Sequence, residues 1–209
     1  MAGCSRPTTV YGCPHMASMR AAARRPALPS NVRVGPGTVI TGDHLTGPLA
    51  FRQFRSERDP GLVVGEHCTI DGVVFNVGPE GRVEIGDYCY LQEALLVCEV
   101  EIRIGNHVAV GWHATIIDAD FHPVAIEARI ADAVACSPLG RGRAHPPFAR
   151  RPVVIEDDAY IGPNVTILKG VRVGAGAFVE AGAVVARDVP PGRRVLGNPA
   201  RLVGRAPAR

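Results

Sequence analysis

A six-residue periodicity runs without interruption through the C-terminal third of this 209-residue chain. Every sixth residue from Ile155 is Ile or Val, and the residue four places after each of these is Ala or Val. The first set is Ile155, Ile161, Ile167, Val173, Val179 and Val185, and the second is Ala159, Val165, Val171, Ala177, Ala183 and Val189. A period of six fits neither a helix, which repeats every 3.6 residues, nor a simple alternating strand. It predicts short strands separated by turns.

Glycine, asparagine and aspartate follow the apolar positions, as they do at residues 162–164 and 174–176, and these residue types tolerate the positive φ of a tight corner. We expect the resulting coils to stack about 4.8 Å apart, with hydrogen bonds between layers. The same phase recurs upstream in fragments, at Val34-Gly35, Val64-Gly65, Ile85-Gly86 and Ile104-Gly105. Cys68 and Cys89 fall on the small-residue position of their hexads, so we expect both to be buried.

Composition agrees with a narrow β-rich interior and excludes several classes of protein. Hydrophobic residues make up 46% of the chain but aromatic residues only 5%, and there are 24 Gly and 18 Pro. The net charge of +3 comes without a basic block interleaved with aromatics, which argues against a nucleic-acid partner. No apolar run is long enough for a signal peptide or a membrane span. The six cysteines form no Cys-x-x-Cys pair, so we predict a cytoplasmic protein with reduced thiols and no metal.

The repeat divides the chain into three parts. Residues 1–30 lack the phase and are interpreted as a lead-in, residues 31–204 as one repeat domain, and residues 205–209 as a tail. Two excursions interrupt the domain, at about 43–62 and at 124–152, and the second contains five arginines. Pro190-Pro191-Gly192 is expected to end the coils. Loops of this length inside a solenoid are usually functional.

Three strings of sequence resemble those of a known family. They are residues 111–123 (GWHATIIDADFHP), residues 152–170, and Gly197-Asn198-Pro199-Ala200-Arg201. On these strings the chain resembles the hexapeptide-repeat acyltransferases, and within them the maltose, galactoside and xenobiotic O-acetyltransferases. The resemblance implies an all-β fold, a left-handed parallel β-helix with three hexads per 18-residue coil. It also implies acetyl-CoA, or another acyl-CoA, as co-substrate.

His122 is the best-placed candidate for a general base, because histidine titrates near neutral pH and this one opens the 124–152 excursion. Pro123 favours an extended backbone before it, so Asp118, Asp120 and His122 should project to one side by alternation. Either aspartate would then orient the imidazole. The resemblance assigns the role of general base to the histidine of this His-Pro motif. His113, expected at a corner, and His145, in a second His-Pro dipeptide, are its rivals.

The position at which the sugar acetyltransferases carry an asparagine near the acceptor aligns with Gln92, next to Glu93. An amide at this position can donate to a hydroxyl or an oxyanion, and the alternative is a polar surface residue. The substitution weakens any inference that the same sugar is the acceptor. The sequence does not identify the acceptor.

Three basic residues, Arg151, Lys169 and Arg187, are spaced one 18-residue coil apart and should stack at one corner of the prism. Such a ladder could neutralise the phosphates of coenzyme A, or its members could splay apart in solvent. The resemblance adds further donor contacts, and Tyr160 stands where many relatives have Trp. Together the cofactor candidates are Tyr160, Pro163, Lys169, Ala181, Ala186, Arg187 and Arg201. Pro163 has no N–H, so it would contact the donor through its carbonyl or its ring.

Together with these residues, the resemblance implies an acetyl-CoA-dependent O-acetyltransferase that acts on a hydroxyl of a sugar, glycoconjugate or small natural product. Transfer is expected to be direct, because no cysteine lies near the His122 motif in the sequence. The resemblance implies a homotrimer with its active sites between prisms. The alternatives are an N-acyltransferase on an amino sugar, a γ-carbonic-anhydrase-like zinc enzyme using His107, His113 and His122, and an inactive scaffold.

Overall fold

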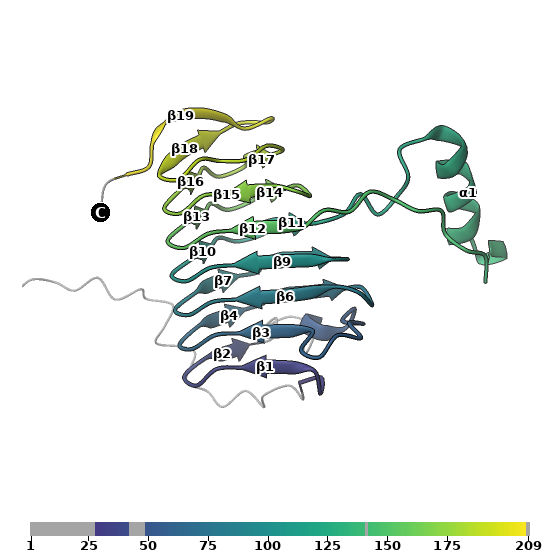
Figure 1. Ribbon diagram of the computed structural model, residues 1–209, viewed down its shortest axis with the longest axis horizontal. Coiled ribbons are helices and arrows are strands. Elements are labelled where there is room, and N and C mark those ends of the chain that lie inside the picture. The colour runs from purple at the N-terminus through teal and green to yellow at the C-terminus, as the bar shows by residue number, and fades with distance from the viewer. Residues whose placement is uncertain (1–27, 42–48, 141, 208–209) are drawn as a thin grey trace, which may run out of the picture.

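The computed structural model describes residues 28–41, 49–140 and 142–207, and they form a prism of stacked coils with one projecting arm (Figure 1). Parallel strands make up the three faces, so the predicted left-handed parallel β-helix is confirmed. The lead-in, except for its last three residues, and residues 42–48 of the first excursion lie outside the described residues. Among the described residues, the structure contains no helix long and apolar enough to cross a membrane.

Each face of the prism is one sheet, and the chain visits the three faces in turn. The six-stranded sheet contains β1 (Val32–Val34), β3 (Leu62–Val64), β6 (Arg82–Ile85), β9 (Glu101–Ile104), β12 (Val153–Ile155) and β15 (Arg172–Val173). The eight-stranded sheet contains β2 (Val39–Thr41), β4 (Thr69–Asp71), β7 (Tyr90–Gln92), β10 (Ala109–Val110), β13 (Tyr160–Ile161), β16 (Phe178–Val179), β18 (Arg193–Leu196) and β19 (Arg201–Arg205). The five-stranded sheet contains β5 (Val74–Val77), β8 (Leu95–Cys98), β11 (Thr115–Ile117), β14 (Thr166–Ile167) and β17 (Val184–Val185).

The hexad positions form the core, as the periodicity predicts. All twelve apolar positions from Ile155 to Val189 are at most 3% exposed, and Cys68 and Cys89 are equally buried. In each two-residue strand one side chain points inward and the other outward, as Ile167 and Thr166 do in β14. Burying an Ile or Val side chain stabilises the fold by about 1.5–3 kcal/mol, so a column of them holds the layers together.

Glycines at the corners allow the layers to approach closely. A Cβ atom on Gly35 would lie 2.7 Å from the carbonyl carbon of Gly65 in the next layer, a distance that real Cβ atoms do not adopt. The residues that follow such glycines turn the corner with positive φ, among them His107 at 55°. The repeat thus depends on its glycines as much as on its apolar residues.

Coil length is regular only in the C-terminal part. Val154 pairs with Arg172, and Thr166 with Val184, each 18 positions further along. Upstream, Tyr90 pairs with Ala109, which is 19 positions away. The first excursion, which includes a 3-10 turn at Leu49–Phe51, accommodates a wider coil in which the ring of Phe51 stacks on the buried Phe75, with their centroids 5.6 Å apart.

The coils continue one strand beyond the predicted stop at Pro190-Pro191-Gly192. β18 pairs with β16 in parallel, and then β19 folds back on β18 in antiparallel register. This hairpin lies at the C-terminal end of the stack (Figure 1).

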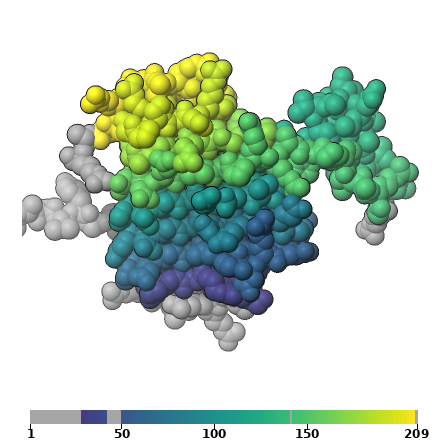
Figure 2. All heavy atoms as spheres, viewed as in Figure 1, coloured from purple at the N-terminus to yellow at the C-terminus, as the bar shows by residue number. Residues whose placement is uncertain are grey.

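The second excursion contains a helix, α1 (Ile126–Cys136), which the periodicity analysis did not predict. We call residues 119–150 the arm. It leaves the prism between β11 and β12 and stands away from the body of the molecule as a separate lobe (Figure 2).

Candidate active site

The arm is attached to the prism by a short two-stranded ribbon. Ala119 and Arg150 form an antiparallel bridge, and the N–H of Asp120 donates to the carbonyl of Ala149 at 2.9 Å. Phe121 then takes a left-handed conformation, with φ at 60°, which is unusual for a bulky residue. This reversal breaks the alternation expected from Asp118 to His122, and it directs His122 into the arm instead of along the prism.

His122 is paired with a residue that the sequence did not single out. Its Nδ1 lies 2.5 Å from Oδ2 of Asp132 on α1. The Asp132 side chain is 4% exposed, whereas that of His122 is 64% exposed. Hydrogen bonds from His122, and then from His145, hold the pKa of Asp132 below its usual value. An ionised carboxylate requires the proton on Nδ1, which leaves the lone pair of Nε2 facing outward as a base.

His145 approaches the same carboxylate from the returning half of the arm. Its Nδ1 lies 2.9 Å from Oδ1 of Asp132 and 4.0 Å from Sγ of Cys136. The structure therefore brings a thiol into the neighbourhood of the His122 motif, although the sequence separation suggested otherwise. Cys136 is exposed, while Cys68, Cys89 and Cys98 are buried.

Asp118 and Asp120, the two aspartates expected to orient His122, bond to other groups. The expectation that one of them orients His122 is therefore wrong. Asp118 is fully buried, and its carboxylate accepts the backbone N–H groups of residues 99, 100 and 101 at 2.7–2.8 Å. It thereby organises the turn between β8 and β9. Asp120 pairs with Lys169, with 2.5 Å between Oδ1 and Nζ.

The predicted basic ladder lies at the corner from which the arm leaves, which we call the arm corner. Strand register places Arg151, Lys169 and Arg187 in successive layers there. Lys169 is half-buried with Asp120, so its charge is balanced within the chain, while Arg151 and Arg187 are exposed. Ala186 adjoins Arg187, and Arg201 lines the same depression of about 380 Å³ as Arg187.

Other candidates lie at a different corner, between the eight- and five-stranded sheets, which we call the Pro163 corner. Gly111, Pro163 and Ala181 follow one another in successive layers there. The Pro163 carbonyl accepts the N–H of Gly182 at 2.9 Å, so this oxygen already serves the corner itself. Tyr160 is partly exposed on the eight-stranded sheet, and its ring stacks on that of Phe178 with the centroids 4.4 Å apart.

Gln92 lies at the end of β7, one layer from Gly111 at the Pro163 corner. It is 6% exposed rather than a surface residue, and its Oε1 accepts the hydroxyl of Tyr90 at 2.8 Å. The five-stranded sheet separates this corner from the arm corner, because β11 begins at one and ends at the other. Within one chain, Gln92 and His122 therefore lie at opposite edges of a face.

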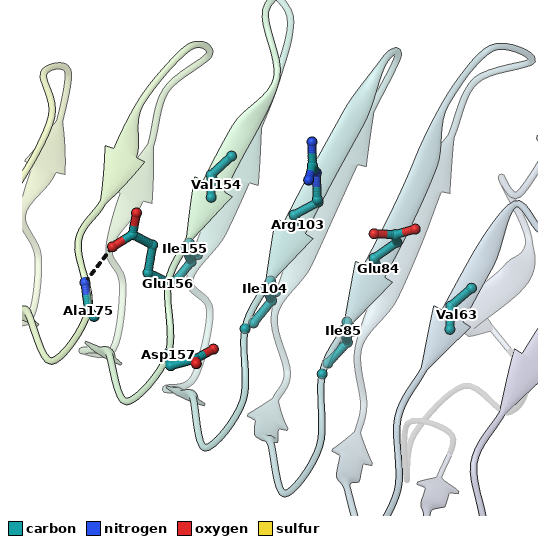
Figure 3. A pocket seen from close by; sticks show the side chains of 12 residues that line it. Val63, Glu84, Ile85, Arg103, Ile104, Val154, Ile155, Glu156, Asp157 and Ala175 are labelled. Carbon is teal, nitrogen blue, oxygen red and sulfur yellow. Dashed lines mark hydrogen bonds between the residues drawn. The ribbon is translucent and has the colours of Figure 1, made fainter.

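A further depression is remote from both corners. It measures about 650 Å³ and lies on the six-stranded sheet, toward the end of β12 that is far from the arm (Figure 3). Glu84 and Arg103 stand side by side on its floor, and Glu156 accepts the N–H of Ala175 at 2.9 Å. This is a shallow charged face, and it contains none of the proposed site residues.

The three histidines of the zinc alternative are not grouped in one chain. His107 lies between β9 and β10 and pairs with Asp158, whereas His113 lies between β10 and β11 and pairs with Glu93. His122 follows β11 at the third corner. His113 is a corner residue, as expected, with φ at 58°.

Asp132 and Cys136 are the residues that sequence reasoning missed. One signal was available: in the 124–152 excursion the acidic residues are Glu127 and Asp132 alone, against five arginines. Either of two carboxylates within a basic, histidine-containing segment is a candidate partner for histidine. The spacing of the histidines gave no indication that the arm would fold back on itself.

Comparison with known proteins gives one family match and two kinds of relative. Residues 152–187 match a family described as bacterial transferase hexapeptide (six repeats). A stretch of 65 residues, 31% of this chain, is 55% identical to a 2,3,4,5-tetrahydropyridine-2,6-dicarboxylate N-acetyltransferase of Staphylococcus aureus. It makes up 27% of that enzyme, so the chain spans about a quarter of the length of the curated relatives that it matches.

Solved structures extend the likeness over most of the prism. A hexapeptide-repeat acetyltransferase of Vibrio cholerae O1 biovar eltor, complexed with acetyl coenzyme A, is 29% identical with a TM-score of 0.56, over 71% of this chain and 72% of that one. A galactoside acetyltransferase in complex with coenzyme A has a TM-score of 0.52 at 19% identity, over 84% of this chain and 64% of that one. The second comparison shows a shared fold.

Proposed function

We infer, from its place among the hexapeptide-repeat acetyltransferases, that this chain transfers an acetyl group from acetyl-CoA to a small-molecule acceptor. The observation that carries the proposal is the exposed His122, hydrogen-bonded through Nδ1 to the buried Asp132. Such a pair has the arrangement that a general base requires, with one nitrogen fixed and the other open. The Vibrio relative is named as an acetyltransferase and was solved with acetyl coenzyme A.

In the proposed reaction, Nε2 of His122 takes the proton from the acceptor as its oxygen or nitrogen attacks the thioester carbonyl. Asp132 stabilises the imidazolium that forms. The C–S bond then breaks, and the proton returns from His122 to the departing thiolate. The exposed Arg151 and Arg187 at the arm corner are placed to meet donor phosphates, which guanidinium groups bind bidentately.

The proposed site is shared between chains of a homotrimer. Gln92, Pro163 and Ala181 lie at one corner, and His122, Ala186 and Arg187 at another, so a donor and an acceptor that touch both sets must lie between two prisms. The arm supports this arrangement, because it projects from its own prism (Figure 2) and exposes apolar side chains. These are Ile126, Ile130, Val134 and Leu139, which are 67%, 61%, 43% and 94% exposed.

We propose a hydroxyl of a sugar, glycoconjugate or small natural product as the acceptor, and an amine as the second candidate. The hydroxyl rests on the resemblance of the His122 motif to the sugar O-acetyltransferases. The amine is favoured by the Staphylococcus aureus relative, an N-acetyltransferase that is 55% identical over its matched stretch. The basic residues of the arm favour an acceptor that carries negative charge in either case.

The proposal is tested by following free thiol released from acetyl-CoA with a panel of neutral and anionic alcohols and amines. With the best acceptor, His122→Ala should lower kcat by about 10²–10⁴-fold, the usual contribution of general-base catalysis. His107→Ala is the matched control, since that side chain is 60% exposed and also paired with a carboxylate. Activity of His122→Ala within threefold of the unmodified chain would refute the assignment.

A further inference from the structure

Helix α1 has almost no core of its own. Of its 11 residues only Asp132 and Ala135 are buried, and the N-cap residue Ala125, which precedes it, provides no side-chain cap. Segments this small generally need a disulfide, a metal ion or a partner to fix their structure. The side of α1 that faces the rest of the arm carries polar, metal-ligating atoms instead of apolar ones.

Three such side chains converge there. Asp132 and Cys136 are one turn apart on α1 and therefore lie on the same face of the helix. His145 reaches them from the returning segment, and one ligand atom from each residue lies within 4.8 Å of the other two. Individually, the Nδ1 atom of His145 is 2.9 Å from Oδ1 of Asp132 and 4.0 Å from Sγ of Cys136.

The arrangement differs from a nucleophilic triad. In a triad the nucleophile and the carboxylate contact opposite nitrogens of the imidazole, so that one nitrogen takes the proton of the nucleophile while the carboxylate holds the other. Here Asp132 and Cys136 both face Nδ1 of His145. Atoms that converge on one point in this way are arranged as ligands around a common centre.

We propose that Asp132, Cys136 and His145 bind a divalent cation of the zinc type, with a water molecule in the fourth position. Carboxylate, thiolate and imidazole are all zinc ligands, and bond lengths of about 2.0–2.3 Å put tetrahedral ligand atoms about 3.5 Å apart. The separation of 2.9 Å between Nδ1 of His145 and Oδ1 of Asp132 is shorter than this, and that of 4.0 Å between Nδ1 and Sγ of Cys136 is longer, so small side-chain adjustments are needed to admit an ion. Binding releases the Cys136 proton to solvent, and His145 gives up its Nδ1 proton and takes one up on Nε2, so that Nδ1 offers a lone pair to the ion.

The proposed ion would lie on the side of α1 that faces the rest of the arm, next to the pair of Asp132 and His122. Only Oδ1 of Asp132 is used, so Oδ2 keeps its hydrogen bond to Nδ1 of His122. At 3.6 residues per turn, Asp132 and Cys136 lie on the side of α1 opposite Ile126, Ile130 and Val134. One face of the helix is thus clamped to its own arm while the other stays exposed. The inference concerns metal binding and stands whether or not the chain transfers an acetyl group.

The test uses the full chain and Zn²⁺ alone. After equilibration with Zn²⁺ and removal of excess, metal analysis should find one ion per chain. Loss of one ligand, in Cys136→Ser or His145→Gln, should lower the Zn²⁺ affinity by at least about 100-fold, because even groups behind the ligands contribute about 10–100-fold. His107→Gln, and a chain with Cys4→Ser and Cys13→Ser, are controls that should keep the ion.

Co²⁺ provides a second measurement that does not depend on stoichiometry. Bound at this site it should show the thiolate-to-cobalt charge-transfer band, and Cys136→Ser should abolish the band while circular dichroism shows an unchanged fold. The proposal is overturned if the chain binds no Zn²⁺, if Cys136→Ser retains the ion with undiminished affinity, or if His107→Gln loses it.

Discussion

Asp132 is the residue through which the arm acts on the proposed base. It is a positioning residue, since its buried carboxylate bonds to Nδ1 of His122. Asp132→Asn keeps its shape but removes the charge that fixes the tautomer, so kcat should fall by about 10-fold to 10⁴-fold, the upper figure being the cost in a serine-protease triad. The KM for acetyl-CoA should stay within about twofold, because the basic ladder is untouched.

Steady-state kinetics of this variant should be compared with Glu127→Gln, which removes the other carboxylate of the excursion and should leave both constants unchanged. A fall in kcat that is matched by an equal rise in KM would indicate a structural role for Asp132.

The buried thiols give the fold a dependence on alkaline pH. Burial raises the pKa of Cys89 to about 12 and also raises the pKa of Cys98, which donates to Asp118. The unfolded chain loses these protons near pH 9 while the folded chain retains them. Stability is therefore complete below pH 9 and declines above it, by about 1.4 kcal/mol per pH unit for each thiol.

Urea unfolding between pH 8 and pH 11 measures this decline. Cys89→Ala removes one thiol and places at Cys89 the residue found at equivalent hexad positions, such as Ala159 and Ala177. Its stability should fall less steeply with pH than that of the unmodified chain. Equal slopes for the two proteins would contradict the assignment.

At the level of elements, the sequence predicts the strands of the prism but does not predict the structure of the arm. The hexads identify the core because each layer repeats the same burial of Ile, Val and Ala, so a local pattern suffices. The arm obeys no repeat, and its geometry depends on the left-handed Phe121, which is a residue type that rarely adopts this conformation. No local preference predicts that turn, and the pairing of His122 with Asp132 follows from it.

The sequence of helix α1 contains a helical pattern, which a search for a six-residue period does not detect. Ile126, Ile130 and Val134 recur every four residues, and the segment is rich in alanine. The helix could have been predicted from this pattern, but not its position, because its apolar side chains are largely exposed in the described part of the chain. The pattern does specify an apolar face on α1, and we expect this face to pack against another surface.

The exposed face of α1 gives a prediction about assembly. If it packs on a neighbouring chain, Ile130→Asp buries a charge and should dissociate the trimer at concentrations where the unmodified chain stays associated. Ala131→Asp, an adjacent exposed position on another side of the helix, is the control. Sedimentation or light scattering measures the difference, and an identical mass profile for the two variants would argue against docking through this face.

For the whole molecule, the proposed sharing of the site between chains of a trimer would make two defective chains complementary. His122→Ala and Gln92→Ala should each be nearly inactive alone. When they are co-expressed with different tags, every mixed trimer contains one boundary where an intact His122 meets an intact Gln92, so it should recover about one third of the normal rate.

The rate of thiol release from acetyl-CoA by purified mixed trimers measures this recovery. A site contained within one chain would show no recovery, because every chain in the mixture would carry a defect.

The antiparallel hairpin of β18 and β19 sets the length of the stack. Sheets of identical layers could in principle extend by adding another molecule, as amyloid does, because an open edge offers unpaired N–H and C=O groups. Here the direction reverses, and residues 197 and 200 bond both backbone groups of Val184 on β17. On these two faces an incoming parallel coil finds no matching edge. The hairpin of β18 and β19 thus acts as a terminator of polymerisation, and it keeps a fold built on unlimited repetition finite.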